Sequence, residues 1–99
     1  MTTLIEVANQ PVIIRSVNAG VHFGYLAGID GNAVKLNRSR RIWRWFGAWT
    51  LSEIAMDGLD AARSKVAAEL PEIVIREWVE IIECAPKAVA AIAAVKWSK

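Results

Sequence analysis

Residues 21–36, VHFGYLAGIDGNAVKL, decide the fold that we expect for this chain. Val21–Ile29 and Ala33–Leu36 have the composition of strands, and they flank the turn residues Asp30-Gly31-Asn32. Asp-Gly between two such runs is a strong signal for a β-hairpin, because these residues tolerate the positive φ angles of a tight turn. Gly24, inside the first run, predicts a β-bulge or a close approach by another backbone or a ligand.

The residues before and after this hairpin predict one more strand and a short helix. Pro11–Val17, PVIIRSV, is short and β-branched, as strands are. Further along, Thr50-Leu51-Ser52-Glu53 matches a capping box, and Gly58 supplies a stop, so we expect a helix of about two turns between them. Residues 59–70 are ambiguous between helix and strand.

The last third of the chain predicts a strand and a final helix. In Glu72–Glu83, which follows Pro71, most β-branched residues share one parity, and Glu77 interrupts the pattern. Ala85-Pro86 opens an alanine-rich helix, because proline is favoured in a first turn. We therefore predict one α+β domain over residues 1–99, with a small antiparallel β-sheet body, one short internal helix and a C-terminal helix.

Composition indicates the oligomeric state and the cellular compartment that we expect for this domain. The chain is 55% hydrophobic with a net charge of only +2, which is apolar for a small monomer and predicts a homo-oligomer. One cysteine excludes an internal disulfide and a cysteine-based metal site within one chain, which fits a cytoplasmic protein. No apolar run approaches the ~20 residues of a membrane span, so we expect no membrane partner.

The candidate binding residues gather in residues 37–49, NRSRRIWRWFGAW, which we call the basic segment. It holds four arginines and three of the five tryptophans, and no acidic residue occurs between Asp30 and Glu53. Guanidinium groups hold phosphate and indole faces stack on bases, so this composition favours a nucleotide or nucleic-acid ligand. The candidate ligand-binding residues are Arg38, Arg40, Arg41, Trp43, Arg44 and Trp45, with Arg15, His22 and Phe23 from the strands before them.

Two interpretations of the basic segment stay open. If it is a strand, Arg41, Trp43 and Trp45 share one face, whereas Arg40, Ile42, Arg44 and Phe46 share the other. The tryptophans then either fill the core, with arginines at its edge, or line a ligand site in which at least two arginines hold an anion. The two interpretations have about equal support for any single residue.

The sequence offers no recognisable catalytic set. His22 is the only histidine, so neither a histidine-pair metal site nor a Ser-His-Asp triad with a second histidine is available, and a lone histidine in a strand is more often structural. No P-loop and no GxGxxG motif occurs. We therefore predict a binding protein rather than an enzyme, with no cofactor and no metal.

Three motifs carry a resemblance that covers nearly the whole chain: Ala19–Gly24 (AGVHFG), Arg40–Trp43 (RRIW), and Gly47-Ala48 followed by Thr50-Leu51 and Glu53. On these motifs the chain resembles a family of small bacteriophage proteins of largely uncharacterised function. It is also similar to phage anti-defence sponge proteins of the Thoeris anti-defence type, which bind cyclic ADP-ribose isomers, and in some members cyclic oligonucleotides, without cleaving them.

That similarity implies a homo-oligomer in the cytoplasm of the infected bacterium, with ligand sites at subunit interfaces. Its function would be immune evasion by sequestration of a cyclic nucleotide signal. The similarity transfers no individual ligand-binding residue to this chain. Two other functions stay open: a nucleic-acid-binding phage accessory protein, and a protein–protein inhibitor of a host factor that uses the tryptophans as a hot spot.

Overall fold

The computed structural model describes residues 9–96, and it confirms the predicted α+β fold. In chain order the elements are β1 (Pro11–Ser16), β2 (Gly20–Asp30), β3 (Ala33–Arg44), α1 (Leu51–Asp57), β4 (Lys65–Val66), β5 (Leu70–Arg76), β6 (Trp78–Glu83) and α2 (Pro86–Ala93). The strands form a six-stranded sheet in the order β4-β3-β2-β1-β6, and β5 also pairs with β3.

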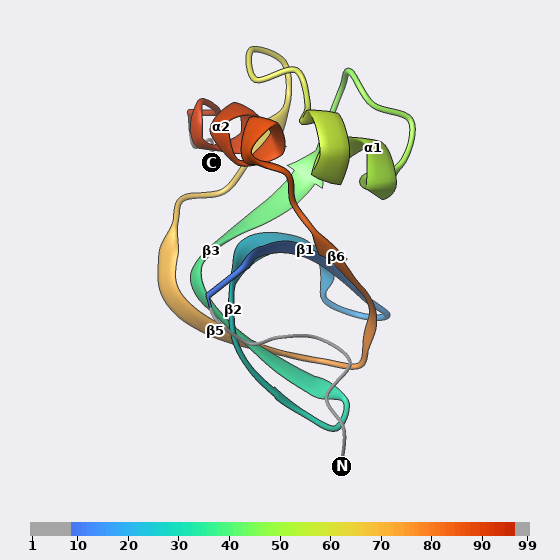
Figure 1. The fold of residues 1–99 in the computed structure, drawn as a ribbon, viewed down its shortest axis with the longest axis vertical. Coiled ribbons are helices and arrows are strands. Elements are labelled where there is room, and N and C mark those ends of the chain that lie inside the picture. The colour runs from blue at the N-terminus through green and yellow to red at the C-terminus, as the bar shows by residue number, and fades with distance from the viewer. Residues whose placement is uncertain (1–8, 97–99) are drawn as a thin grey trace.

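The sheet curls into a ring, because one stretch of chain joins its two sides. Strand β5 pairs with the first part of β3, and the chain then turns at Glu77, whose φ is 58°, into β6, which pairs with β1. Every pairing in this ring is antiparallel. Figure 1 looks into the ring, with β1, β2, β5 and β6 around its opening and the two helices above it.

The predicted hairpin and helices are confirmed. Asp30 pairs with Ala33 across the turn, and α1 begins after Thr50, whose hydroxyl accepts a hydrogen bond from the Glu53 backbone N–H at 3.2 Å. Gly58 ends α1. The turn and the helix cap both depend on neighbouring residues, and the residue types found there are specific to these structures.

Two parts of the chain differ from the sequence-based expectation. The prediction of one strand over residues 72–83 is wrong, because the positive φ at Glu77 divides this stretch into β5 and β6. The second strand of the hairpin, predicted for Ala33–Leu36, extends to Arg44. Residues 59–70 contain the short strand β4 and otherwise connect elements.

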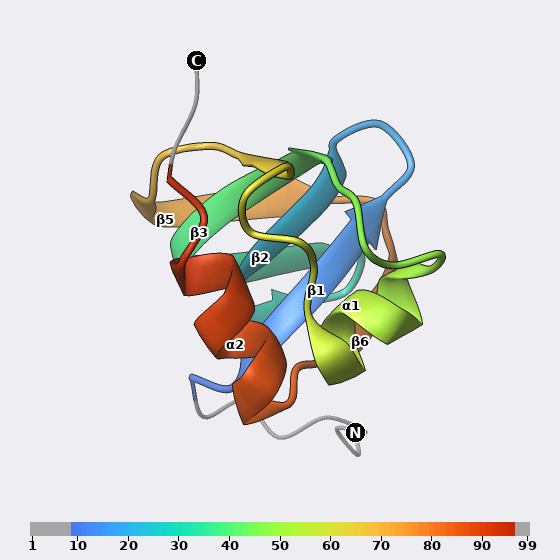
Figure 2. The same ribbon diagram turned by 90° about the horizontal axis from the view of Figure 1, so that it is seen from above.

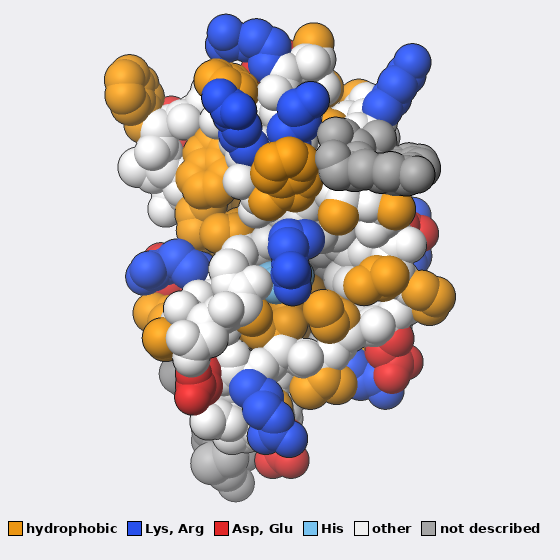
Figure 3. All heavy atoms as spheres, turned by 180° about the vertical axis from the view of Figure 1, so that it is seen from behind, with side chains coloured by type: hydrophobic (Ala, Val, Ile, Leu, Met, Phe, Trp, Pro, Cys, Tyr) orange, Lys and Arg blue, Asp and Glu red, His pale blue; other side chains and the backbone are white. Residues whose placement is uncertain are grey.

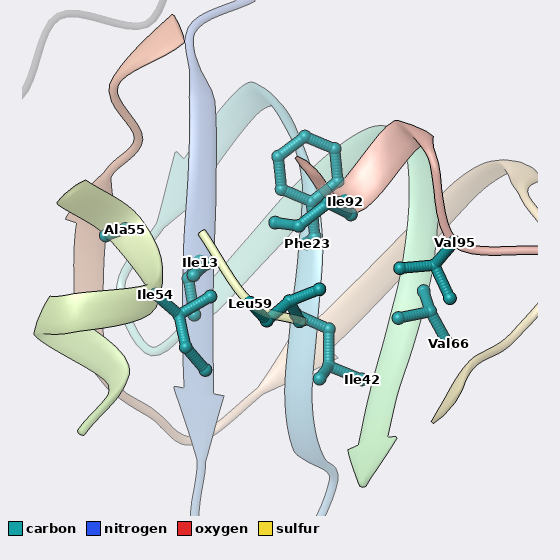
Figure 4. Packing of buried hydrophobic residues seen from close by; sticks show 9 residues of the cluster. All are labelled: Ile13, Phe23, Ile42, Ile54, Ala55, Leu59, Val66, Ile92 and Val95. Carbon is teal, nitrogen blue, oxygen red and sulfur yellow. The ribbon is translucent and has the colours of Figure 1, made fainter. Parts of the chain in front are cut away.

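Two buried clusters hold the fold together. One lies inside the ring and consists of Val12, Ile14, Leu26, Val34, Leu36 and Ile75. The other lies between the sheet and the helices and consists of Ile13, Phe23, Ile42, Ile54, Ala55, Leu59, Val66, Ile92 and Val95. Figure 4 shows these side chains meeting from both helices and from the strands, and Figure 2 shows the helices next to each other over the sheet. Strand β1 serves both clusters, since its side chains alternate between the two faces.

Gly24 shows why these strands can approach so closely. A Cβ atom at this position would lie 2.9 Å from the Cβ of Leu36 on β3, closer than real side chains allow. The register of β2 against β3 also shifts at this point, but the extra residue lies on β3, so of the two alternatives predicted for Gly24 the structure shows the close approach of a neighbouring strand. Among the helices of residues 9–96, none has the length and apolar character needed to cross a membrane.

Candidate functional site

Strand β3 directs neighbouring arginines to opposite sides of the sheet. Phe23 pairs with Arg40 and Tyr25 pairs with Asn37, so β3 has one extra residue between these pairs. Arg38 lies in this bulge with a φ of 50°, a conformation that is uncommon for residues other than glycine. Beyond the bulge, side chains alternate again, and the arginines therefore have different surroundings.

Arg40 lies on the helical side of the sheet, where it bonds to backbone. Its guanidinium donates to the carbonyl oxygens of Ala67, Ile92 and Val95, each at 2.9 Å. These bonds join β3 to the chain before β5 and to the C-terminal end of α2, whose last carbonyls have no partner within the helix. Burial lowers the pKa of Arg40, and nearby Glu69 opposes this effect. Because three of its five N–H donors are bound to backbone carbonyls, we place Arg40 in the framework rather than in the ligand site.

Arg38 lines a groove between the sheet and α2 but has partners of its own. Its guanidinium lies 4.9 Å from the centre of the Tyr25 ring and forms an ion pair with Glu69 at 3.4 Å. The groove has a volume of about 700 Å³ and is bordered by Lys96 at the end of the described chain. Phe23 contributes to the wall but is buried in the core under the helices, so its ring face is not free to stack on a ligand.

Three cations that form no ion pair within residues 9–96 lie at the other end of β3 and on β4. We call Arg41, Trp43, Arg44 and Lys65 the arginine–tryptophan surface. Both arginines are exposed, the Trp43 side chain is 49% exposed, and none of the three cations takes part in an ion pair within residues 9–96. Figure 3 shows Lys and Arg side chains gathered with apolar groups over the upper part of this face, whereas acidic side chains lie mainly lower down and at its margins.

A second bulge presents Trp43 to solvent. Ile42 pairs with Val66 and Arg44 pairs with Lys65, so Trp43 has no partner on β4. The pairing of Arg44 with Lys65 places two positive charges opposite each other, an arrangement that is unfavourable in a sheet unless an anion compensates. This end of β3 therefore combines unpaired positive charge with an accessible indole.

Phe46 supports one edge of this surface. The Arg44 guanidinium lies 5.3 Å and the Arg63 guanidinium 4.7 Å from the centre of its ring. Arg63 is also bound to Asp60 at 3.1 Å, and the bonds that Asp60 accepts from Arg63 and neighbouring backbone lower the pKa of this carboxyl. Arg63 is thus neutralised locally, while Arg44 is not.

A small hollow opens next to Arg41, on the side of the sheet away from the helices. It has a volume of about 370 Å³ and is lined by His22, Ser39, Arg41, Ala67, Ala68, Leu70 and Ile73. His22 lies directly opposite Arg41 on the neighbouring strand. The His22 and Ser39 side chains are almost fully buried, whereas Arg41 is exposed at the rim.

The protonation of His22 follows from its surroundings. Its Nε2 lies 2.8 Å from the carbonyl oxygen of Ala19, which can only accept, so Nε2 carries the proton. Burial lowers the pKa of His22, and the positive charge of Arg41 lowers it further, although the bond to Ala19 acts in the opposite direction. The ring is therefore neutral at physiological pH, and its Nδ1 is an acceptor.

The remaining predicted residues lie apart from this surface. Trp45 is half-buried against the cluster under the helices. Arg15 lies on β1, where it forms an ion pair with Glu80 of β6 at 2.6 Å. Of the nine predicted residues, Arg41, Trp43 and Arg44 lie at the end of β3, and Arg41 lines the hollow together with His22.

Sequence reasoning missed Ser39 and Lys65. Lys65 reaches the surface only through the pairing of β4 with β3, and it lies in residues 59–70, which the sequence left ambiguous between helix and strand. Ser39 belongs to the basic segment, but its importance depends on the bulge at Arg38, which brings it to the same side as His22. Trp49, which is 92% exposed, lies in the same segment but outside the surface defined above.

The described residues contain no group of three or more His, Cys, Asp or Glu side chains arranged to hold a metal ion. Cys84 is partly buried, and burial raises the pKa of its thiol to about 12. A thiol with that pKa stays protonated at physiological pH and is a poor nucleophile.

Comparison with known families places the chain in one of them. Residues 9–92 match the family described as domain of unknown function DUF6948, and the chain belongs to this family. No curated protein and no solved structure matches this chain.

Proposed function

We propose that this protein binds a nucleotide-type ligand through the arginine–tryptophan surface and releases it chemically unchanged. The observation that carries this proposal is that Arg41, Arg44 and Lys65, at the paired ends of β3 and β4, form no ion pair within residues 9–96 and share this end of the sheet with the half-exposed indole of Trp43. Arginine provides charge-assisted hydrogen bonds to phosphate, and an exposed indole offers a face on which a base can stack.

The chemistry of these side chains supports binding rather than reaction. A guanidinium is always protonated in proteins, so Arg41 and Arg44 cannot serve as general bases. An indole provides neither a nucleophile nor a transferable proton of useful acidity. The proposal therefore assigns the surface to recognition of charge and of an aromatic ring.

The specific function that we propose first is sequestration of a cyclic nucleotide immune signal by a homo-oligomer during phage infection. The arginine–tryptophan surface is open in one copy of the chain, and retention of a small ligand requires its exclusion from water. A second copy placed over this surface would provide that enclosure. The apolar composition of the chain, 55% hydrophobic, is consistent with such an interface.

Binding of single-stranded nucleic acid is the second candidate, and the openness of the same surface favours it. Arg41 and Trp43 share one face of β3 and Arg44 ends the strand, so the cations and the indole are spread along a strand rather than arranged around a closed pocket. Proteins that bind single strands without strong sequence preference combine such basic tracks with aromatic stacking. This candidate predicts an affinity that falls steeply with salt, because bound phosphates release counterions.

Calorimetric titration of the full chain tests both candidates. The ligands are cyclic ADP-ribose isomers, cyclic di- and trinucleotides and short single-stranded oligonucleotides, each at two salt concentrations. We expect Arg44→Ala to lower the affinity for the bound ligand about tenfold or more, as for a lost charge-assisted contact of about 1.5–3 kcal/mol. Arg15→Ala, which removes an exposed and already paired arginine elsewhere, is the matched control and should change affinity less than twofold.

The outcomes separate the alternatives. Tight and weakly salt-dependent binding of one cyclic nucleotide, recovered intact after denaturation of the protein, supports sequestration. Steeply salt-dependent binding of oligonucleotides alone supports the second candidate. If no ligand binds, or if Arg15→Ala and Arg44→Ala weaken binding equally, the proposal is wrong.

A further inference from the structure

We propose that the hollow lined by His22, Ser39 and Arg41 is a subsite for one nucleoside 5′-monophosphate unit, with the phosphate on Arg41 and the base inside. This proposal rests on the proposed function and assigns a specific part of the ligand to a specific part of the molecule. The three side chains come from adjacent strands, and His22 lies directly across from Arg41. The hollow lies beside Ser39 and Arg41 of β3, and Trp43 follows Arg41 on the same face of the strand.

The size and lining of the hollow fit such a unit. Its volume of about 370 Å³ lies within the ~300–1,000 Å³ typical of small-molecule sites. Leu70 and Ile73 of β5 provide apolar contact for a ring, while Ala67 and Ala68 leave space at the opening. A mostly apolar wall with few polar groups is the usual lining of a site for an aromatic ligand.

Its polar groups are still available to a ligand. The Ser39 hydroxyl forms no side-chain hydrogen bond among those found in residues 9–96. The ring of His22 uses Nε2 for Ala19, and no partner for Nδ1 is present in the same part of the chain. The hollow is the opening that His22 lines.

The charge distribution favours a phosphate at the rim rather than inside. Arg41 is exposed and forms no ion pair in residues 9–96, and it is the only charged side chain that lines the hollow. The deeper groups, Ser39 and the neutral ring of His22, carry no net charge. A ligand with one anionic end and one uncharged aromatic end matches this arrangement.

His22 provides a direct measurement, because it is the only histidine and its ring signals in an NMR spectrum therefore need no further assignment. The full-length protein is titrated with adenosine 5′-monophosphate, ribose 5-phosphate and inorganic phosphate. We expect the adenosine monophosphate to shift the His22 ring signals to saturation, with an affinity at least tenfold higher than that of inorganic phosphate. Equal affinity for the three would mean that Arg41 binds any anion and would overturn the assignment of the base.

Two variants locate the site. Ala68→Glu adds a carboxylate at an exposed position on the opening, and we expect it to weaken binding of adenosine monophosphate at least tenfold. Ala90→Glu makes the same change at an exposed position of α2 and should alter binding less than twofold. Because Ala68 also borders the groove near Arg38, Ser39→Ala is the second variant, and it should weaken binding at least threefold by removing one hydroxyl from the hollow.

The failures of the two proposals are distinguishable. Suppose that a ligand binds with an affinity that Arg44→Ala lowers, but that binding leaves the His22 signals unchanged and Ser39→Ala leaves the affinity unchanged. The assignment of the subsite is then wrong, and the proposed function stands. If Ala68→Glu and Ala90→Glu weaken binding to the same extent, the subsite is also wrong. If no nucleotide or oligonucleotide binds at all, both proposals fail.

Discussion

Replacement of Arg40 by methionine tests whether this arginine belongs to the framework. The Arg40 guanidinium donates three hydrogen bonds of 2.9 Å to backbone carbonyls that come from two separate parts of the chain. Two of the acceptors, Ile92 and Val95, lie at the C-terminal end of α2, where a positive charge is also favourable for the helix dipole. Methionine retains most of the alkyl length but none of the donors.

The expected loss is smaller than the sum of three strong hydrogen bonds. Each bond to a charged group contributes about 1.5–3 kcal/mol. The guanidinium must be partly removed from water, as the lowered pKa of Arg40 indicates, and the released carbonyls near the surface recover some hydration. We therefore expect Arg40→Met to lower the free energy of unfolding by about 2–4 kcal/mol. In a domain of about 100 residues this corresponds to a fall in Tm of roughly 10–25 °C.

Arg38→Met is the matched control, because Arg38 lies on the same strand and undergoes the same substitution. Its guanidinium is exposed, and its ion pair with Glu69 at 3.4 Å should contribute no more than about 1 kcal/mol. Urea unfolding followed by circular dichroism gives both values. A loss below about 1 kcal/mol for Arg40→Met, or one no larger than that of Arg38→Met, would refute the structural role assigned to Arg40.

Three further predictions concern the sheet, the buried histidine and the first helix. Gly24→Ala should lower the free energy of unfolding by about 1–3 kcal/mol, because the new Cβ would lie 2.9 Å from Leu36. Gly28→Ala is the control, because a Cβ there has nothing within 4 Å, and it should cost less than about 1 kcal/mol in the same urea experiment. Folding lowers the pKa of His22 below its usual 6.5, so the unfolded chain binds the proton more readily. Stability should therefore be full above pH 6.5 and decrease as the pH falls below it, and unfolding of the His22→Gln variant at pH 7.5 and 5.5 should show a smaller difference than the unchanged protein. Thr50→Ala removes the acceptor at the N-terminus of α1 and should lower the free energy of unfolding by about 1 kcal/mol, with an unchanged Tm as the contradicting result.

The features that the sequence predicted well are those in which neighbouring residues provide the signal. The turn at Asp30-Gly31-Asn32 needs a positive φ at Gly31, and the hydroxyl of Thr50 caps a helix that begins at the next residue. The close approach predicted for Gly24 also depends on a property of the residue itself, its lack of a side chain. Features of this kind can be predicted without knowing which distant parts of the chain come into contact.

The features that the sequence could not provide depend on distant parts of the chain. The turn at Glu77 follows from the need to leave β3 and pair with β1, which closes the ring. The partners of Arg40 lie 27 to 55 residues away, so composition alone could not distinguish this arginine from Arg41 beside it. The alternation of side chains along a strand correctly assigned Arg40 and Arg41 to opposite faces. It did not indicate which face the helices would cover.

This separation divides one short segment into a face that belongs to the fold and a face that carries the proposed ligand site. On one side of β3, Arg40 and Ile42 face the helices and are held by them. On the other side, Ser39 and Arg41 face the hollow, and neither helix covers them. Substitutions at Arg40 should therefore change stability first, whereas substitutions at Arg41 should change ligand affinity with little loss of stability. A variant of Arg41 that unfolds as readily as Arg40→Met would show that the two faces are not independent, and that the rim of the hollow is part of the framework.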